Sequence, residues 1–200
     1  MLRFLVFQGF HRGLFGMCGP GAGAKLPVMP MSSSEGKDWI RERIAVLAAE
    51  RPVTVLDIGP GVGTYAKLLA GLPVGRVIGI EIYEPYVHTY RLREYYDEII
   101  LGDARTLAFP EADVVILGDV AEHMTEDEAL GLWAKSRAAA ARAVYLSIPV
   151  VHYPQDEIEG NPHEVHVVDD WNHERVLKTF EGIGEFWTGT EVGVYECRTA

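Results

Sequence analysis

The stretch VLDIGPGVGTY, residues 55–65, decides the fold of this chain. It opens with apolar residues typical of a buried strand, continues through Gly59, Gly61 and Gly63, and runs on into a helical pattern. Glycine permits positive φ and close approach of a ligand, and the helix start behind the turn offers unpaired N–H groups. Thr64 stands where a dinucleotide fingerprint has its last glycine, so the spacing does not favour a dinucleotide. The stretch predicts a strand, a ligand-binding turn and a helix.

The alternation of strand and helix continues along the chain. Strands are predicted at residues 53–58, 76–82, 98–101, 112–117, 144–148, 183–188 and 191–197. Helices are predicted from about residue 34, and at residues 64–70, 85–95, 126–141 and 171–180. Such alternation predicts an α/β, Rossmann-like, doubly wound, mostly parallel sheet with helices on both faces. The last two strands, joined by a tight turn at Gly189 and Thr190, predict an antiparallel C-terminal hairpin.

The first part of the chain differs from the rest. Glycines and prolines crowd residues 16–30, after an apolar, Arg-containing stretch. We expect residues 1–31 to be a disordered extension, or to precede a natural start at Met31, with a targeting peptide as the alternative. The domain then spans residues 32–200. Its first helix is predicted to begin near Ser34, because the serines there offer N-cap hydroxyls.

Length, composition and charge limit the class of protein. The 200 residues fit one domain, and 48% hydrophobic with 24% charged residues exclude a disordered, collagenous or coiled-coil chain. Cys18 and Cys197 lie at opposite ends, which excludes a disulfide framework and fits a reducing compartment. A net charge of −11 argues against a nucleic-acid partner, and no apolar run is long enough to cross a bilayer. We therefore expect a cytoplasmic monomer or homodimer without membrane contact.

Acidic residues follow three of the predicted strands. Asp57 ends the first, Glu81 lies near the end of the second, and Asp103 follows the third. The carboxyl ends of parallel strands lie on one edge of the sheet, where open α/β folds bind their ligands. A single acid there is an ordinary polar strand end, but three on one edge predict a binding site. A carboxylate such as Glu81 can accept both hydroxyls of a ribose.

On these residues the chain resembles the class I S-adenosylmethionine-dependent methyltransferases over about residues 53–150. The resemblance implies a seven-stranded sheet whose last strand is antiparallel. It implies that Asp57 and the glycine loop hold the methionine part of S-adenosylmethionine, that Glu81 holds the ribose, and that Asp103 with Ala104 holds the adenine. The predicted cofactor-binding residues are Asp57, Gly59, Pro60, Gly61, Gly63, Glu81, Ile82, Asp103, Ala104 and Asp119.

The fourth strand leads into a short polar segment. Asp119, Glu122 and His123 are spaced so that a helical turn would place all three on one face. Two carboxylates and an imidazole can handle a proton, hold a metal or merely line the cofactor pocket. We predict His123 as general base with Glu122 beside it. The metal alternative resembles some 2′-O-methyltransferases of small RNAs and ubiquinone-pathway O-methyltransferases, and its ligands would be Asp119, Glu122, His123 and His163.

A long loop after the fifth strand bears on the same site. Residues 152–170 contain His152, His163 and His166, several acids, and no Lys or Arg. A loop of this length is functional or disordered, and its aromatic and proline residues favour an ordered lid over the sheet edge. His166 is the second candidate base. The acidic character suits an amine or sugar acceptor.

Tyrosines gather around the helix predicted after the second strand. They are Tyr83, Tyr86, Tyr90, Tyr95 and Tyr96. Their spacing predicts mainly packing and surface roles, with Tyr83 near the adenine.

These observations predict an enzyme that transfers a methyl group from S-adenosylmethionine to a small molecule, at a sugar or natural-product hydroxyl or amine. Two alternatives stay open: a metal-assisted RNA 2′-O-methyltransferase, and a non-catalytic protein that binds adenosylmethionine. The net charge argues against the first. The complete set of acids along the sheet edge argues against the second.

Overall fold

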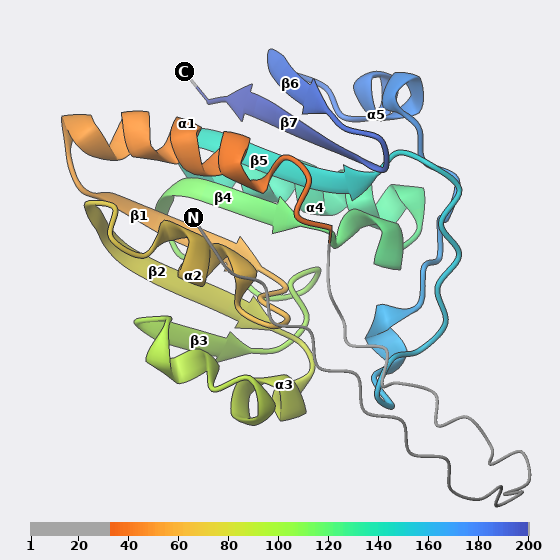
Figure 1. The fold of residues 1–200 in the computed structure, drawn as a ribbon, viewed down its shortest axis with the longest axis horizontal. Helices are drawn as coiled ribbons and strands as arrows, with labels where there is room; N and C mark the ends of the chain where they lie inside the picture. The colour runs from red at the N-terminus through yellow and green to blue at the C-terminus, as the bar shows by residue number, and fades with distance from the viewer. Residues whose placement is uncertain (1–32, 200) are drawn as a thin grey trace, which may run out of the picture.

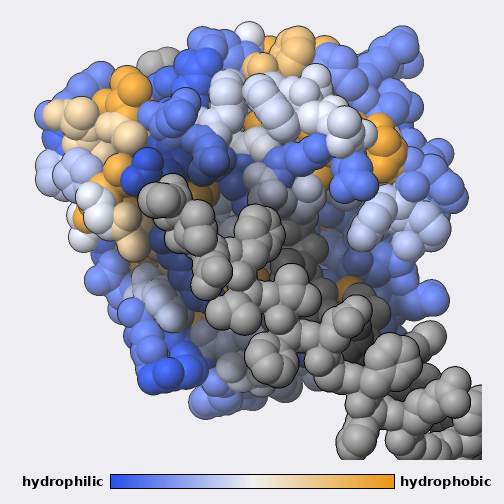
Figure 2. Space-filling view, in the orientation of Figure 1, coloured by the Kyte–Doolittle hydropathy of each residue, from blue (hydrophilic) through white to orange (hydrophobic). Residues whose placement is uncertain are grey.

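A computed structural model describes residues 33–199 of the chain. The expectations for residues 1–31 and for Cys18 lie outside the described residues. Within the described part, no helix is long and apolar enough to span a membrane. The face of the molecule shown in Figure 2 is mostly hydrophilic, with small apolar patches.

A seven-stranded sheet forms the centre of the fold, as predicted. Its strands are β1 Val53–Ile58, β2 Val74–Glu81, β3 Glu98–Leu101, β4 Ala112–Gly118, β5 Ala140–Pro149, β6 Glu185–Thr188 and β7 Val192–Arg198. The spatial order is β3-β2-β1-β4-β5-β7-β6 (Figure 1). All neighbours from β3 to β5 are parallel, whereas β7 is antiparallel to both β5 and β6. The predicted Rossmann-like sheet with an antiparallel C-terminal hairpin is confirmed.

Helices cover both faces of the sheet. They are α1 Lys37–Glu50, α2 Thr64–Leu69, α3 Glu84–Thr89, α4 Glu126–Ala139 and α5 His173–Thr179, with short 3-10 turns η1 Leu92–Glu94, η2 Ala121–His123 and η3 Pro162–Glu164. In Figure 1, α1 and α2 lie in front of the sheet and α4 lies behind it.

The central strands are apolar throughout because successive side chains enter opposite cores. Val55 and Val114 pack in the core beneath α1 and α2. Their neighbours Leu56 and Val115 pack in the other core, with Trp133 of α4. Period-two alternation therefore buries every position of a strand that is covered on both sides.

Two predicted helices have different boundaries. The first begins at Lys37 rather than near Ser34, and its N-cap is Gly36 with φ 72° and no side-chain cap, so the predicted serine cap is wrong. The helix predicted at residues 85–95 is divided into α3 and η1, because Arg91 between them has φ 56° in the left-handed region.

The helix predicted at residues 126–141 has the expected start and an earlier end. Thr125 and Glu128 form a complete capping box at the start of α4. The helix ends at Ala139, because Ala140 already pairs with Ala112 and β5 continues from there to Pro149. The fifth strand is thus longer than the predicted residues 144–148.

Candidate active site

The glycine loop connects β1 to α2 in left-handed backbone conformations. Gly59, Gly61 and Gly63 have φ values of 67°, 54° and 78°. Side chains rarely tolerate this region, so glycine is required for the turn. Gly59, Pro60 and Gly61 line the cavities described next, whereas Gly63 is the N-cap of α2 and faces away from them.

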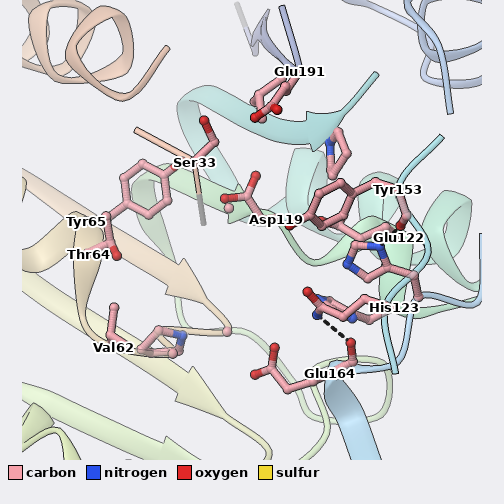
Figure 3. Close-up of a pocket in the computed structure, with 18 residues that line it drawn as sticks. Ser33, Val62, Thr64, Tyr65, Asp119, Glu122, His123, Tyr153, Glu164 and Glu191 are labelled. Carbon is pink, nitrogen blue, oxygen red and sulfur yellow. Dashed lines mark hydrogen bonds between the residues drawn. The ribbon is translucent and has the colours of Figure 1, made fainter. Parts of the chain in front are cut away.

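Two adjoining cavities lie along the carboxyl edge of the sheet. The β2–β3 cavity, of about 200 Å³, is lined by the ends of those strands and by residues 161–165; Glu81, Ile82, Asp103, Ala104 and His163 all face it. The β4–β5 cavity, of about 230 Å³, is lined by the glycine loop, the end of β4 and the start of β7 (Figure 3). Gly59, Gly61, Asp119, His123 and Glu164 line both cavities.

The two predicted acids of the β2–β3 cavity are held by hydrogen bonds. Glu81 is 3% exposed and accepts from the backbone N–H groups of Gly61 at 3.2 Å and Tyr83 at 2.8 Å. Burial raises its pKa to about 6. Asp103 accepts from the backbone N–H and guanidinium of Arg105, and this hydrogen bonding lowers its pKa. Both carboxylates are therefore fixed in orientation at the cavity wall.

Asp57 lies behind the glycine loop rather than in a cavity. Its side chain is fully buried, its Oδ2 accepts from the Tyr96 hydroxyl at 2.5 Å, and its Oδ1 has no hydrogen-bond partner. Burial raises its pKa to about 7. Tyr96 packs in a small core with Leu92 and Ile99, in line with the packing role predicted for the tyrosines. Sequence reasoning missed its second role, which is that its hydroxyl supports an acid of the predicted site.

Asp119 forms a buried ion pair that the sequence did not indicate. Lys37 Nζ donates to Asp119 Oδ2 at 2.9 Å, and Ser147 Oγ donates to Oδ1 at 2.6 Å. Asp119 has φ 55°, and its carboxylate lies between Tyr65 and Tyr153 in Figure 3. A lysine at a helix start is typical of a solvated position, so no local signal distinguished Lys37.

Glu122, His123 and His166 come together at the junction of η2 with the loop after β5. One polar atom from each lies within 4.8 Å of the others. His123 Nδ1 lies 3.2 Å from the Val165 carbonyl oxygen, and His166 Nδ1 lies 2.5 Å from that of Tyr153. A carbonyl oxygen only accepts, so each neutral ring carries its proton on Nδ1 and its lone pair on Nε2. Each ring can therefore accept a proton at Nε2.

Burial determines the charge of this cluster. Desolvation lowers the pKa of His123 and of His166 below the usual 6.5, so both rings are neutral at pH 7. Desolvation also raises the pKa of Glu122 well above its usual value, and its Oε2 has no hydrogen-bond partner. Burial therefore disfavours the charged form of all three side chains.

The alternative metal ligands do not all converge. Glu122 and His123 lie together, but the third member of the cluster is His166. His163 faces the β2–β3 cavity, and Asp119 is engaged in its ion pair. A metal at this place stays a prediction, and the residues gathered for it are Glu122, His123 and His166.

Residues 150–172, here called the strap, run along the sheet edge between β5 and α5 (Figure 1). The backbone carbonyl of Glu122 accepts from the N–H groups of Val167 and Val168. At the other end, the Tyr83 and Tyr90 hydroxyls donate to the Gly160 carbonyl and the Glu159 carboxylate at 3.4 and 3.0 Å. Part of the tyrosine run thus anchors the strap, beyond the packing role predicted for it.

Comparison with known proteins agrees with this geometry. Residues 56–138 match a family model described as a methyltransferase domain. This match agrees with the predicted class I S-adenosylmethionine-dependent methyltransferase family, enzyme class and cofactor. No curated protein sequence matches this chain.

Most of this chain is similar in fold to solved structures. Magnesium protoporphyrin IX methyltransferase from Synechocystis, with bound S-adenosylmethionine, is 20% identical with a TM-score of 0.61, over 83% of this chain and 79% of that one. A Pyrococcus horikoshii protein is 20% identical with a TM-score of 0.60, over 85% and 93%. The N-terminal domain of EvdMO1, studied with S-adenosylhomocysteine and D-fucose, is 16% identical with a TM-score of 0.58, over 83% and 84%. At these identities the likeness shows the fold.

Proposed function

We propose that the protein transfers a methyl group from S-adenosylmethionine to a hydroxyl or amine of a small molecule. The observation that carries this proposal is that His123 lines both cavities, with its lone pair on Nε2. Separate cavities for cofactor and acceptor, with a base at their boundary, suit an in-line transfer whose acceptor must lose a proton.

The residues around the β2–β3 cavity fit the cofactor. Glu81 is a hydrogen-bond acceptor suited to ribose hydroxyls, and Asp103 with Ala104 suits the adenine. The glycine loop leaves space beside its backbone, since a Cβ at Gly61 would meet nothing closer than 3.9 Å. The carboxylate of Asp119, which lines both cavities, suits the methionine amino group, whereas Asp57 lines neither cavity. When bound, S-adenosylmethionine supplies a methyl group already activated on sulfur.

The β4–β5 cavity suits the acceptor. His123 removes the proton of the accepting group, since its ring is neutral and its Nδ1–H is fixed by the Val165 carbonyl. His166, on the strap, packs edge-to-face against it at 4.9 Å and is the second base. Residues of the strap line both cavities, among them Tyr153, Glu164 and His166. The porphyrin and D-fucose named for two structural relatives are small molecules, which supports an acceptor of that class.

The cavities do not favour the RNA alternative. The described residues that line them include one arginine, Arg105, and it is paired with Asp103 and Glu128. Binding of an RNA backbone depends on basic groups that neutralise phosphates. An acceptor without phosphates is therefore the better match.

The first test is thermal unfolding with S-adenosylhomocysteine. A ligand at 100 times its Kd stabilises the folded state by about 2.7 kcal/mol, and we expect a shift of that order. Glu81→Gln should reduce the shift, whereas Glu174→Gln, an exposed site on α5, should leave it unchanged. The absence of any shift in the wild type would contradict the cofactor assignment.

The second test measures conversion of S-adenosylmethionine to S-adenosylhomocysteine with a panel of sugars, phenols and amines, and in parallel with short RNA. Turnover with a panel member is the expected result. Turnover with RNA alone, lost on chelation of metal, would favour the RNA alternative. Cofactor binding without turnover on any acceptor would favour a non-catalytic protein.

A further inference from the structure

The β4–β5 cavity has an uneven charge balance. Asp119, Glu122, Glu164 and Glu191 line it, and no Lys or Arg does so among the described residues. Asp119 is paired with Lys37, so the unmatched negative charge of this wall rests mainly on Glu191.

The nearest cations are already paired with other groups. Lys37 donates to Asp119, so this pair is neutral as a unit. Arg105 pairs with Asp103 and Glu128 around the other cavity. Glu191, at the start of β7, is exposed and forms no ion pair with any residue of the range 33–199. Its charge is the one most available to a ligand.

A buried acceptor atom also faces this cavity. Glu122 is 2% exposed, and its Oε2 has no hydrogen-bond partner. Buried carboxyl oxygens are normally satisfied, and an orphaned one costs free energy unless a donor arrives. A ligand with several N–H donors would satisfy it.

An aromatic ring completes the wall. Tyr153 of the strap is 47% exposed and packs at 5.5 Å against His166. Tyr153 lines the same cavity as Glu122 and Glu191. Carboxylates and a tyrosine face together favour a cation, since the ring face is electron-rich.

We propose that the acceptor is a small molecule that carries an ammonium group, held by Glu191 and the Glu122 carboxyl group against Tyr153. This inference rests on the proposed methyltransferase function and names its substrate class. It predicts discrimination against acceptors that carry a carboxylate or phosphate at the same place, since these would face the uncompensated acids.

The test uses matched probes on the full-length protein saturated with S-adenosylhomocysteine. One series is tyramine, tyrosol and 4-hydroxyphenylacetate; the other is 6-amino-6-deoxyglucose, glucose and glucuronate. Each series keeps one scaffold and changes the group from ammonium to hydroxyl to carboxylate. Calorimetry should find the ammonium member of at least one series roughly tenfold tighter than the neutral member, with the carboxylate weakest.

Variants assign the preference to the wall. Glu191→Gln should reduce the ammonium preference, and Glu191→Lys should reverse it in favour of the carboxylate. Glu181→Gln, an exposed acid that lines neither cavity, is the matched control and should change nothing. Equal binding of ammonium and carboxylate members, no binding of either ammonium probe, or an order unaffected by Glu191→Gln would each overturn the inference.

Two readouts separate this inference from the function beneath it. Thermal stabilisation by S-adenosylhomocysteine alone measures cofactor binding. If the wild-type protein showed no such stabilisation, the proposed methyltransferase function would be contradicted. If stabilisation were seen but the ammonium preference were not, only the inference about the acceptor would fail. Sinefungin is a cofactor analogue with an additional amine at the position of the transferred methyl group. It tests whether the acids of this wall bind the cofactor instead of the acceptor. If Glu191→Gln weakened sinefungin relative to S-adenosylhomocysteine and left every acceptor probe unchanged, the charge would belong to the cofactor, and the inference would fail.

Discussion

Lys37 and Asp119 lie 82 residues apart in the chain and form an ion pair with an Nζ–Oδ2 distance of 2.9 Å. Their side chains are 7% and 13% exposed. The pair ties the first residue of α1 to the end of β4, at a place where Asp119 has the left-handed φ of 55°. A carboxylate held in this way is oriented before any ligand binds.

Replacement of Lys37 should destabilise the fold. Lys37→Met leaves the Asp119 carboxylate buried without its cation, which costs about 3 kcal/mol of unfolding free energy. Chemical denaturation measures the loss. Lys178→Met, at an exposed position of α5, is the control and should stay within about 0.5 kcal/mol of wild type.

A double variant separates the pair from a general loss of packing. Lys37→Met combined with Asp119→Asn removes both charges, so the combined loss should be smaller than the sum of the single losses. Strict additivity would show that the two side chains do not interact energetically.

Asp57 should make stability fall as the pH rises. Below its usual pKa of 3.8 the carboxyl is protonated in the folded and the unfolded chain alike. Between that value and about 7 the unfolded chain loses the proton while the buried group keeps it, so the folded state loses relative stability. Asp57→Asn removes this dependence and should stabilise the protein by roughly 2–4 kcal/mol at pH 8, with little difference near pH 4.

Denaturation of both proteins across pH 4 to 8 measures this effect. Asp156→Asn, an exposed position on the strap, is the matched control. Parallel pH profiles for Asp57→Asn and the wild type would show that Asp57 is ionised in the folded state.

The local sequence was sufficient to predict the strands of the sheet and the acids that line the β2–β3 cavity. Strands β1 and β3 have the predicted bounds, because short apolar runs between turn residues have a strong local preference. The acids at Glu81 and Asp103 face one cavity for a reason that is also local: parallel strands end on the same edge.

The missing parts of the site depend on contacts between distant segments. Tyr96 meets Asp57 across 39 residues, and Lys37 meets Asp119 across 82. No periodicity predicts such partners, since each arises from the packing of helices onto the sheet. His166 rather than His163 lies beside His123 because of the path of the strap. Hydrogen bonds from Val167 and Val168 to the Glu122 carbonyl fix that path.

Two glycines should respond in opposite ways to alanine. A Cβ at Gly118, the last residue of β4, would lie 2.1 Å from the Tyr65 ring, so Gly118→Ala must displace that ring from the β4–β5 cavity wall. We expect a loss of about 2 kcal/mol. A Cβ at Gly131 of α4 would meet nothing within 4 Å, and Gly131→Ala should add about 0.5–1 kcal/mol through helix propensity. Chemical denaturation measures the change in unfolding free energy for each variant. An unchanged stability of Gly118→Ala would contradict the close approach of Gly118 to the Tyr65 ring.

His123 should control turnover more than cofactor binding. With an acceptor identified from the panel, His123→Ala removes the base and should slow turnover by about 10²–10⁴-fold, while S-adenosylhomocysteine binding changes little. His88→Ala, an exposed histidine of α3, is the control, and His166→Ala should have a smaller effect. A base must be unprotonated, and desolvation lowers the His123 pKa below 6.5, so wild-type turnover should decline only below that pH as the medium is acidified. Unchanged turnover in His123→Ala would move the role to His166, and a decline that begins above pH 6.5 would show that the ring is not desolvated in the working enzyme.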